Sequence, residues 1–199
     1  MDEVMTRPSG RPLRRWLARV PRQGGRQSPP MPPGIRRRRD RDLSTCVRLV
    51  RRAFFEGQFP GLHDLDPRDW LSGPDVMSAW LAERDGEVAG HVAISQVGLD
   101  TASALRWREV TGRDPSELLA VSRLFVRPRF RGQGIAASLV DVAVADIRAR
   151  GLVPVLEVVT TSSLAPSYSR DHGWRLRSTE PLPDGRGLWV HRHEAASTH

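Results

Sequence analysis

The chain has 199 residues, a net charge of +8 and 31 basic residues, all of which are arginine. Its single cysteine, Cys46, excludes an internal disulfide, and no apolar run approaches the roughly 18 residues that a membrane span needs. No charged-then-apolar signal peptide is visible, so we expect a cytoplasmic protein without membrane contact. The length predicts one domain with appendages.

The positive charge is concentrated at the N-terminus. Residues 1–41 hold 12 arginines against three acidic residues, whereas the rest of the chain has a net charge of −1. Residues 1–34 are rich in Arg, Pro and Gly and lack apolar periodicity, so we expect a disordered arm. Three interpretations stay open: a solvated tail, a segment that binds nucleic acid through its arginines, or a stretch ahead of a true start at Met31. We expect no nucleic-acid contact outside residues 1–34.

Apolar spacing and turn signals predict alternating strands and helices from residue 35 onward. Asp40 or Asp42 is expected to cap a first helix, Asp66 with Pro67 a short one, and Asp85-Gly86 predicts a hairpin. In chain order, the expected elements are strand 35–39, helix 43–55, short helix 66–71, strands 77–84 and 87–97, helix 102–110, a strand ending at residue 126, a helix of about 16 residues from residue 135, strand 153–159, helix 165–174, and strands 174–178 and 187–192.

The segment from Leu124 to Ala136 is the most informative part of the chain. It has the pattern of a strand that Pro128 ends, a turn with two glycines and the first turn of a helix. The first turn of a helix has about four amides without intrahelical partners and carries roughly half a positive charge. Gly132 and Gly134 let an anion approach the main chain. The pattern therefore predicts a cradle for diphosphate, with an ordinary surface turn as the alternative.

The run Arg129-Phe130-Arg131-Gly132-Gln133-Gly134 resembles the Arg/Gln-x-x-Gly-x-Gly/Ala signature of the GNAT acyltransferases. The similarity extends over residues 119–180 and, more weakly, back to Ile35. It implies one α/β (α+β) domain over residues 35–195, of the acyl-CoA N-acyltransferase type. Such a domain has a mixed, mainly antiparallel, splayed sheet of six or seven strands with helices on both faces. Dimers are frequent in the family, so a homodimer is one expected state.

The resemblance implies acetyl-CoA as co-substrate. Main-chain groups of the fourth strand would pair with the pantetheine arm, amides of the loop and helix would hold the diphosphate, and two arginines would add positive charge. A strand amide would polarise the thioester carbonyl. The expected cofactor-binding residues are Leu124, Phe125, Val126, Arg129, Arg131, Gly132, Gln133, Gly134, Ile135, Ala136 and Ala137. We expect no metal, because His191 and His193 share a strand face without an evident third ligand.

The resemblance also implies transfer of an acetyl group to an amine, on a small molecule or a protein terminus, by direct attack. An alkyl amine with a pKa near about 10.4 is mostly protonated at pH 7, so a base is required. Glu157, in an apolar strand, is the candidate base, with an ordinary paired or exposed residue as the alternative. The family's acid, a tyrosine four residues before Gly173, is replaced by Ser169 here. The only tyrosine, Tyr168, lies about 100° away on a helix, so both stay candidate acids.

Two other functions stay open on the sequence. Ser169 at the acid position suggests an acyl-CoA-binding module with little or no catalysis, and the arm suggests a nucleic-acid-associated protein. The resemblance implies that the long connection over residues 99–118 lies on the acceptor side. There, Trp107, Arg108 and Glu109 would either line the substrate pocket or belong to a packing flap.

Overall fold

A computed structural model describes residues 34–55, 65–159, 173–181 and 187–193 of the chain. The arm expected over residues 1–34 lies outside them except for its last residue. So do most of the helix expected over 165–174 and both candidate acids. The domain boundaries at residues 35 and 195 therefore stay a prediction.

The described strands form one seven-stranded sheet in the order β1-β2-β3-β4-β5-β7-β6. Every neighbouring pair is antiparallel except β4 and β5, which are parallel. The mixed, mainly antiparallel sheet expected from the sequence is thus confirmed. Its strands are β1 Ile35–Arg37, β2 Val76–Arg84, β3 Glu87–Ser95, β4 Leu118–Val126, β5 Val153–Val159, β6 Trp174–Pro181 and β7 Gly187–His193.

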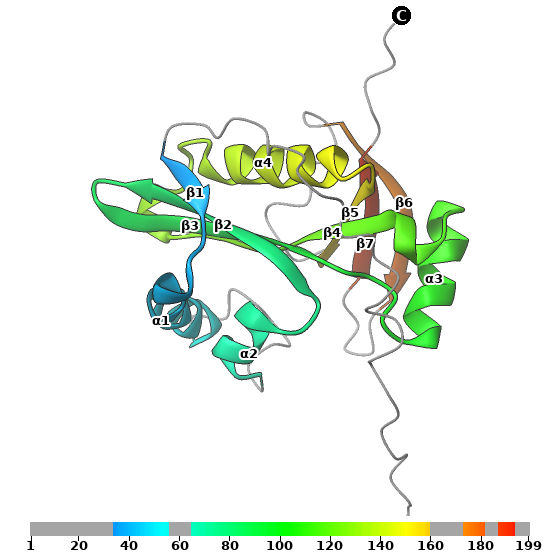
Figure 1. Ribbon diagram of the computed structural model, residues 1–199, viewed down its shortest axis with the longest axis horizontal. Helices are drawn as coiled ribbons and strands as arrows, with labels where there is room; N and C mark the ends of the chain where they lie inside the picture. Colours follow the sequence, from blue (N-terminus) through cyan, green and yellow to red (C-terminus); the bar gives the residue numbers. More distant parts are fainter. Residues whose placement is uncertain (1–33, 56–64, 160–172, 182–186, 194–199) are drawn as a thin grey trace, which may run out of the picture.

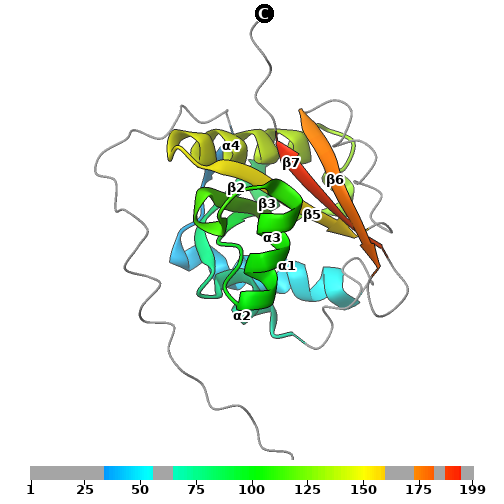
Figure 2. The same ribbon diagram turned by 90° about the vertical axis from the view of Figure 1, so that its right-hand side faces the viewer.

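Helices cover both faces of this sheet, as Figure 1 shows. Helix α4 lies along one face, and α1 and α2 lie against the other. Helix α3, in the long connection after β3, stands beside β5 and β6 (Figure 2). Their bounds are α1 Leu43–Phe55, α2 Pro67–Ser72, α3 Thr101–Thr111 and α4 Ile135–Ala149.

The helix starts follow the sequence signals in one case and depart from them in another. The Asp66 carboxylate caps α2, accepting hydrogen bonds from the amides of Arg68 at 2.6 Å and Asp69 at 3.4 Å. Asp42, by contrast, does not cap α1. It sits in a 3-10 turn ahead of that helix and accepts a bond from the amide of Arg39 at 2.7 Å. The Asp42 carboxylate therefore stabilises the 3-10 turn rather than the start of α1.

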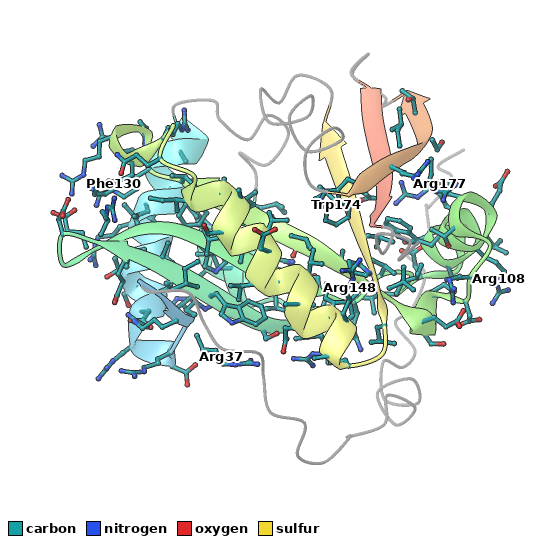
Figure 3. The ribbon with its side chains drawn as sticks, turned by 90° about the horizontal axis from the view of Figure 1, so that it is seen from above. Arg37, Arg108, Phe130, Arg148, Trp174 and Arg177 are labelled. Carbon is teal, nitrogen blue, oxygen red and sulfur yellow. The ribbon has the colours of Figure 1, made fainter. Side chains whose placement is uncertain are left out.

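The core lies in layers on both sides of the sheet. On the α4 side, Leu139, Ala143 and Ile147 pack against β2 to β5, and Trp174 of β6 closes the cluster (Figure 3). On the α1 side, Cys46 is fully buried with Phe125 and behaves as a small apolar residue. Burial raises the pKa of the Cys46 thiol to about 11. A thiol in this environment stays protonated and unreactive.

Strands β4 and β5 separate after a short contact. Their pairing covers only Leu118–Ala120 against Val153–Val155, although β4 runs on to Val126 and β5 to Val159. Along its other edge, β5 pairs with β7 from Val155 to Val159. The sheet is therefore splayed between its fourth and fifth strands, as the sequence resemblance implied.

The packing of α4 gives a stability prediction. Leu139→Ala, at a fully buried position, should lower the free energy of unfolding by about 2–5 kcal/mol, because it removes apolar contacts and leaves a cavity. The matched control is Leu105→Ala on α3, where the side chain is 58% exposed and the loss should stay within about 0.5 kcal/mol. Urea unfolding measures both. Equal losses would contradict the placement of α4 on the sheet.

Candidate functional site

The loop between β4 and α4 depends on two glycines in the left-handed conformation. Gly132 and Gly134 both have φ +74°, and Gly134 is the N-cap residue of α4. This conformation costs other L-residues about 1–2 kcal/mol. A Cβ built on either glycine would meet no atom within 4 Å, so the space over this backbone is open. The glycines are thus needed for the shape of the turn, and that shape leaves the main chain accessible.

The start of α4 presents a row of available amides. The amide of Ser138 makes the first bond of the helix, to the carbonyl of Gly134 at 3.1 Å, and no side chain caps the helix. Within the described part of the chain, the amides of residues 134–137 have no acceptor. Four available donors at the positive end of a 15-residue helix are chemically suited to a phosphate group.

The arginines of the loop hold different positions. Arg129 forms an ion pair with Glu87, at the start of β3, and its guanidinium lies 4.6 Å from the centre of the Phe130 ring. Arg127 pairs with the same carboxylate. Arg129 first and Arg127 second lower the pKa of Glu87. Arg131 instead donates from Nε to the carbonyl of Val126 at 3.3 Å. Part of the loop's formal charge is therefore offset by Glu87.

Strand β4 contains a bulge just before the loop. Val92 of β3 lies opposite two residues of β4, Arg123 and Leu124. Arg123 has φ +52°, a left-handed value that is uncommon outside glycine. A bulge inserts one residue and changes which edge of the strand each later backbone group faces. The flanking pairs that define it are Ala93–Ser122 and His91–Phe125.

The bulge decides which amides face the splay. The amide of Arg127 donates to the carbonyl of Ala89 on β3 at 2.9 Å. Backbone groups alternate in direction along a strand, so those of Phe125 also face β3. Those of Leu124 and Val126 face the opposite edge, toward the gap between β4 and β5. Of the three strand residues expected to pair with pantetheine, the geometry favours these two.

A fully buried histidine supports the bulge. Nδ1 of His91 donates to the carbonyl of Arg123 at 2.9 Å. Nε2 of the same ring lies 3.1 Å from Nη1 of Arg38. It stacks on Phe125 at 5.2 Å. Because a guanidinium can only donate, Nε2 must accept and Nδ1 must carry the proton. Burial, and then the two nearby guanidinium groups, lower the pKa of His91 to about 3, so the ring is neutral.

Glu157, the candidate base, faces the α3 side of the splay. Val155 packs under α3 with Trp107, and Leu156 packs with α4, so the alternation of side chains directs Glu157 to the face opposite α4. It lies two residues beyond the last pair between β4 and β5. Its carboxylate forms an ion pair with Arg106 of α3. Sequence reasoning missed Arg106, which is 51 residues away in the chain.

The connection that carries α3 is mainly a packing element. Trp107 is 3% exposed within an apolar cluster, Arg108 pairs with the exposed Asp114 at 2.6 Å, and Glu109 is exposed. Of the two sequence interpretations, the packing flap fits Trp107 and the pocket wall does not. The nearby Glu117 pairs with Arg113 at 3.3 Å.

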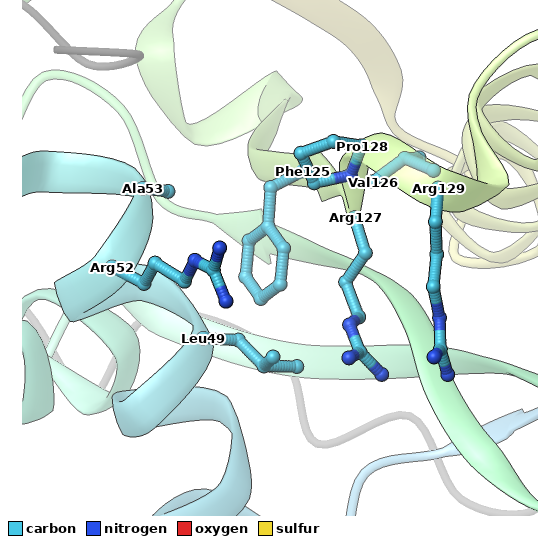
Figure 4. A pocket seen from close by; sticks show the side chains of 8 residues that line it. All are labelled: Leu49, Arg52, Ala53, Phe125, Val126, Arg127, Pro128 and Arg129. Carbon is cyan, nitrogen blue, oxygen red and sulfur yellow. The ribbon is translucent and has the colours of Figure 1, made fainter. Parts of the chain in front are cut away.

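A pocket of about 180 Å³ lies between the end of α1 and the end of β4. Figure 4 shows Arg52 on one side of the Phe125 ring and Arg127 and Arg129 on the other. The lining combines apolar side chains with three guanidinium groups, and the pocket lies on the face of the sheet opposite α4. The lining residues are Leu49, Arg52, Ala53, Phe125, Val126, Arg127, Pro128 and Arg129.

Two further observations concern the described residues as a group. No three His, Cys, Asp or Glu side chains among them lie where they could hold a metal ion. None of their helices is both long and apolar enough to cross a bilayer. The candidate acids Tyr168 and Ser169 lie outside these residues, so their positions in the site stay predictions.

Comparison with known proteins agrees with this geometry. The sequence model of the acetyltransferase (GNAT) family matches residues 43–173. The splayed sheet and the glycine loop thus belong to a GNAT-type acyltransferase, and the chain is a member of the acetyltransferase (GNAT) family. No curated protein sequence matches it.

Solved structures share the fold at low sequence identity. A GNAT-family acetyltransferase from Streptococcus pneumoniae is 16% identical with a TM-score of 0.58, over 80% of this chain and 98% of its own. A ribosomal-protein-alanine N-acetyltransferase from Brucella melitensis is 15% identical with a TM-score of 0.55, over 81% of this chain and 99% of its own. A ribosomal-protein-S18-alanine N-acetyltransferase from Escherichia coli is 14% identical with a TM-score of 0.52, over 83% of this chain and 97% of its own. At these identities the likeness shows the fold alone.

The buried His91 predicts a pH-dependent stability. Its pKa of about 3 in the folded protein lies below the ordinary value of about 6.5. The contribution of the neutral ring to the free energy of unfolding is therefore complete above pH 6.5. It is lost as the pH falls toward 3, by up to about 1.4 kcal/mol per pH unit. The stability difference between the wild type and His91→Asn should shrink from pH 7 to pH 4, as measured by denaturant unfolding. A difference that stays constant over that range would contradict a neutral, buried ring.

Proposed function

We propose that the protein transfers an acetyl group from acetyl-CoA to an amine by direct attack. The observation that carries the proposal is the row of main-chain donors that begins at the splay edge of β4 and resumes, after the loop, at the first turn of α4. Leu124 and Val126 direct backbone groups into the gap, and the amides of residues 134–137 follow at the helix start. An extended pantetheine arm that ends in a diphosphate matches this row in both shape and charge.

The chemistry requires a neutral amine and a polarised thioester. The amine nitrogen attacks the carbonyl carbon, a carbon–nitrogen bond forms, the carbon–sulfur bond breaks, and CoA leaves as a thiolate that takes up a proton. A preorganised amide of β4 would stabilise the oxygen on which negative charge develops, an effect worth several kcal/mol in other enzymes. The base must remove one proton from the amine, directly or through water.

One feature on the face opposite α4 supports an acceptor site there. Glu157 lies on the β5 arm of the splay, two residues beyond the last pair with β4. We assign the base to Glu157, held by Arg106 of α3. Tyr168 and Ser169 remain our candidates for the acid that protonates the thiolate. The acceptor is an amine on a small molecule or a protein terminus.

Substitution of Gly134 tests the cofactor site. Gly134→Glu should raise the Kd of acetyl-CoA by on the order of 100-fold, because it strains the loop and puts a carboxylate among the amides. The matched control is Gly151→Glu at the other end of α4. Gly151 has φ +76° and open space around it, so backbone strain and added charge are the same. Calorimetry of both variants measures the change. Unchanged affinity in Gly134→Glu would overturn the proposed acetyl-CoA site.

Substitution of Glu157 tests the base. Glu157→Gln should lower kcat by about 10²–10⁴-fold with an unchanged Kd for acetyl-CoA, as measured by thiol release with a panel of amines. The matched control is Glu83→Gln, at an exposed carboxylate that pairs with Arg36, and it should keep full turnover. A wild type that binds acetyl-CoA but releases no thiol with any amine would instead favour the binding-module alternative. Salt-sensitive DNA binding that is lost on deletion of residues 1–34 would favour the nucleic-acid alternative.

A further inference from the structure

We propose that His91 is a positioning residue that fixes the bulge of β4 and thereby directs two backbone amides at the pantetheine arm. This inference rests on the proposed function. The bulge brings Phe125 opposite His91. Without it, Leu124 would take that place and the backbone groups of Leu124 and Val126 would face β3 instead of the splay. The position of one extra residue therefore decides which amides are available to a ligand.

Side-chain packing independently supports this register. Leu119 and Val121 of β4 pack on the α4 side two residues apart, and the next residue in that cluster is Leu124, three residues on. Phe125 packs on the opposite side with α1. The spacing between residues on the α4 side thus changes from two to three. This change locates the extra residue at Arg123, where the backbone is left-handed. A non-glycine residue in this conformation persists when its surroundings hold it there.

His91 holds the main chain of Arg123, and other groups hold its side chain. The carbonyl of Arg123 accepts the bond from Nδ1 of His91. Its guanidinium donates to Asp75 at 3.0 Å and to the hydroxyl of Ser95 at 2.5 Å. It also donates from Nε to the carbonyl of Trp70. Both ends of the strained residue are therefore anchored, in a site where the Arg123 side chain is 12% exposed.

The same network fastens α2 to the strand. Trp70 and Leu71 lie in the last turn of α2, where carbonyl groups lack intrahelical donors. Arg123 donates to the first carbonyl, and Nη1 of Arg38 donates to the second at 2.8 Å. That same Nη1 lies 3.1 Å from Nε2 of His91. His91 thus connects α2 to the bulge: its Nε2 accepts from Arg38, which holds α2, and its Nδ1 donates to Arg123.

Two substitutions of His91 separate these bonds. His91→Asn places an amide near the Nδ1 position and can keep the donor to Arg123, whereas His91→Gln reaches the Nε2 position and keeps only the acceptor for Arg38. CoA and ADP are the probes, because ADP carries the diphosphate without the pantetheine arm. His91→Gln should raise the Kd of CoA about tenfold, the size of one hydrogen bond, with the Kd of ADP within about twofold. His91→Asn should leave both nearly unchanged.

A milder pair of variants protects the test against misfolding. Asp75→Asn loosens the guanidinium of Arg123 at a site near the surface, and we expect a smaller, selective loss of CoA affinity. Its matched control is Asp114→Asn, where an exposed aspartate pairs with Arg108 and neither affinity should change. A purely structural role would lower stability without separating CoA from ADP. Equal CoA affinity in His91→Gln, His91→Asn and Asp75→Asn would overturn the inference.

Amide hydrogen exchange keeps this test independent of the proposed function. The amides of Phe125 and Arg127 should exchange faster in His91→Gln than in His91→Asn if the ring fixes the bulge. If the wild type does not bind CoA while this difference appears, the proposed function fails and the control of the bulge by His91 stands. If CoA binds but exchange and affinity are the same in both variants, the assignment of His91 fails alone.

Discussion

The structure depends on the early end of the pairing between β4 and β5. Backbone donors and acceptors need partners, and β4 meets this need along one edge through β3. Along its other edge, pairing with β5 stops at Ala120. Beyond that point, Arg131 reaches the carbonyl of Val126 from the loop. An extended molecule with amide groups can take the place of the missing strand, which is how sheet edges recognise peptides.

In the proposed cofactor site, dipoles of the main chain rather than formal charges would attract the anion. Arg127 and Arg129 share Glu87, so the net charge they present is smaller than the sequence suggests. The amides at the start of α4 have no such counter-ion among the described residues. Their direction is fixed by the backbone, whereas an exposed arginine pair is screened by salt. In the proposed site, several donors in one row suit a diphosphate better than a single anion.

Local signals predicted the elements, and non-local contacts set the site. The helix expected over residues 43–55 is α1, and Asp85-Gly86 joins β2 to β3, because spacing and turn chemistry act within a few residues. The placement of β7 between β5 and β6 carried no such local signal.

The same distinction explains what the sequence reasoning missed in the site. The pattern of residues 129–134 located the glycine loop, whose conformation depends on neighbouring residues. The ion pair between Arg106 and Glu157 spans 51 positions, and the bulge at Arg123 depends on His91, 32 positions away. No periodicity in the chain encodes either contact.

The chemistry at position 91 explains why a neutral imidazole suits it. The site needs a donor toward the carbonyl of Arg123 and an acceptor toward the guanidinium of Arg38, at opposite ends of one flat group that stacks on Phe125. An ionised carboxylate offers acceptors only, and an ammonium offers donors only and would add a third buried cation. The neutral ring supplies one of each without charge. Its depressed pKa is the consequence of a position chosen for geometry, and it keeps the bulge fixed throughout the physiological pH range.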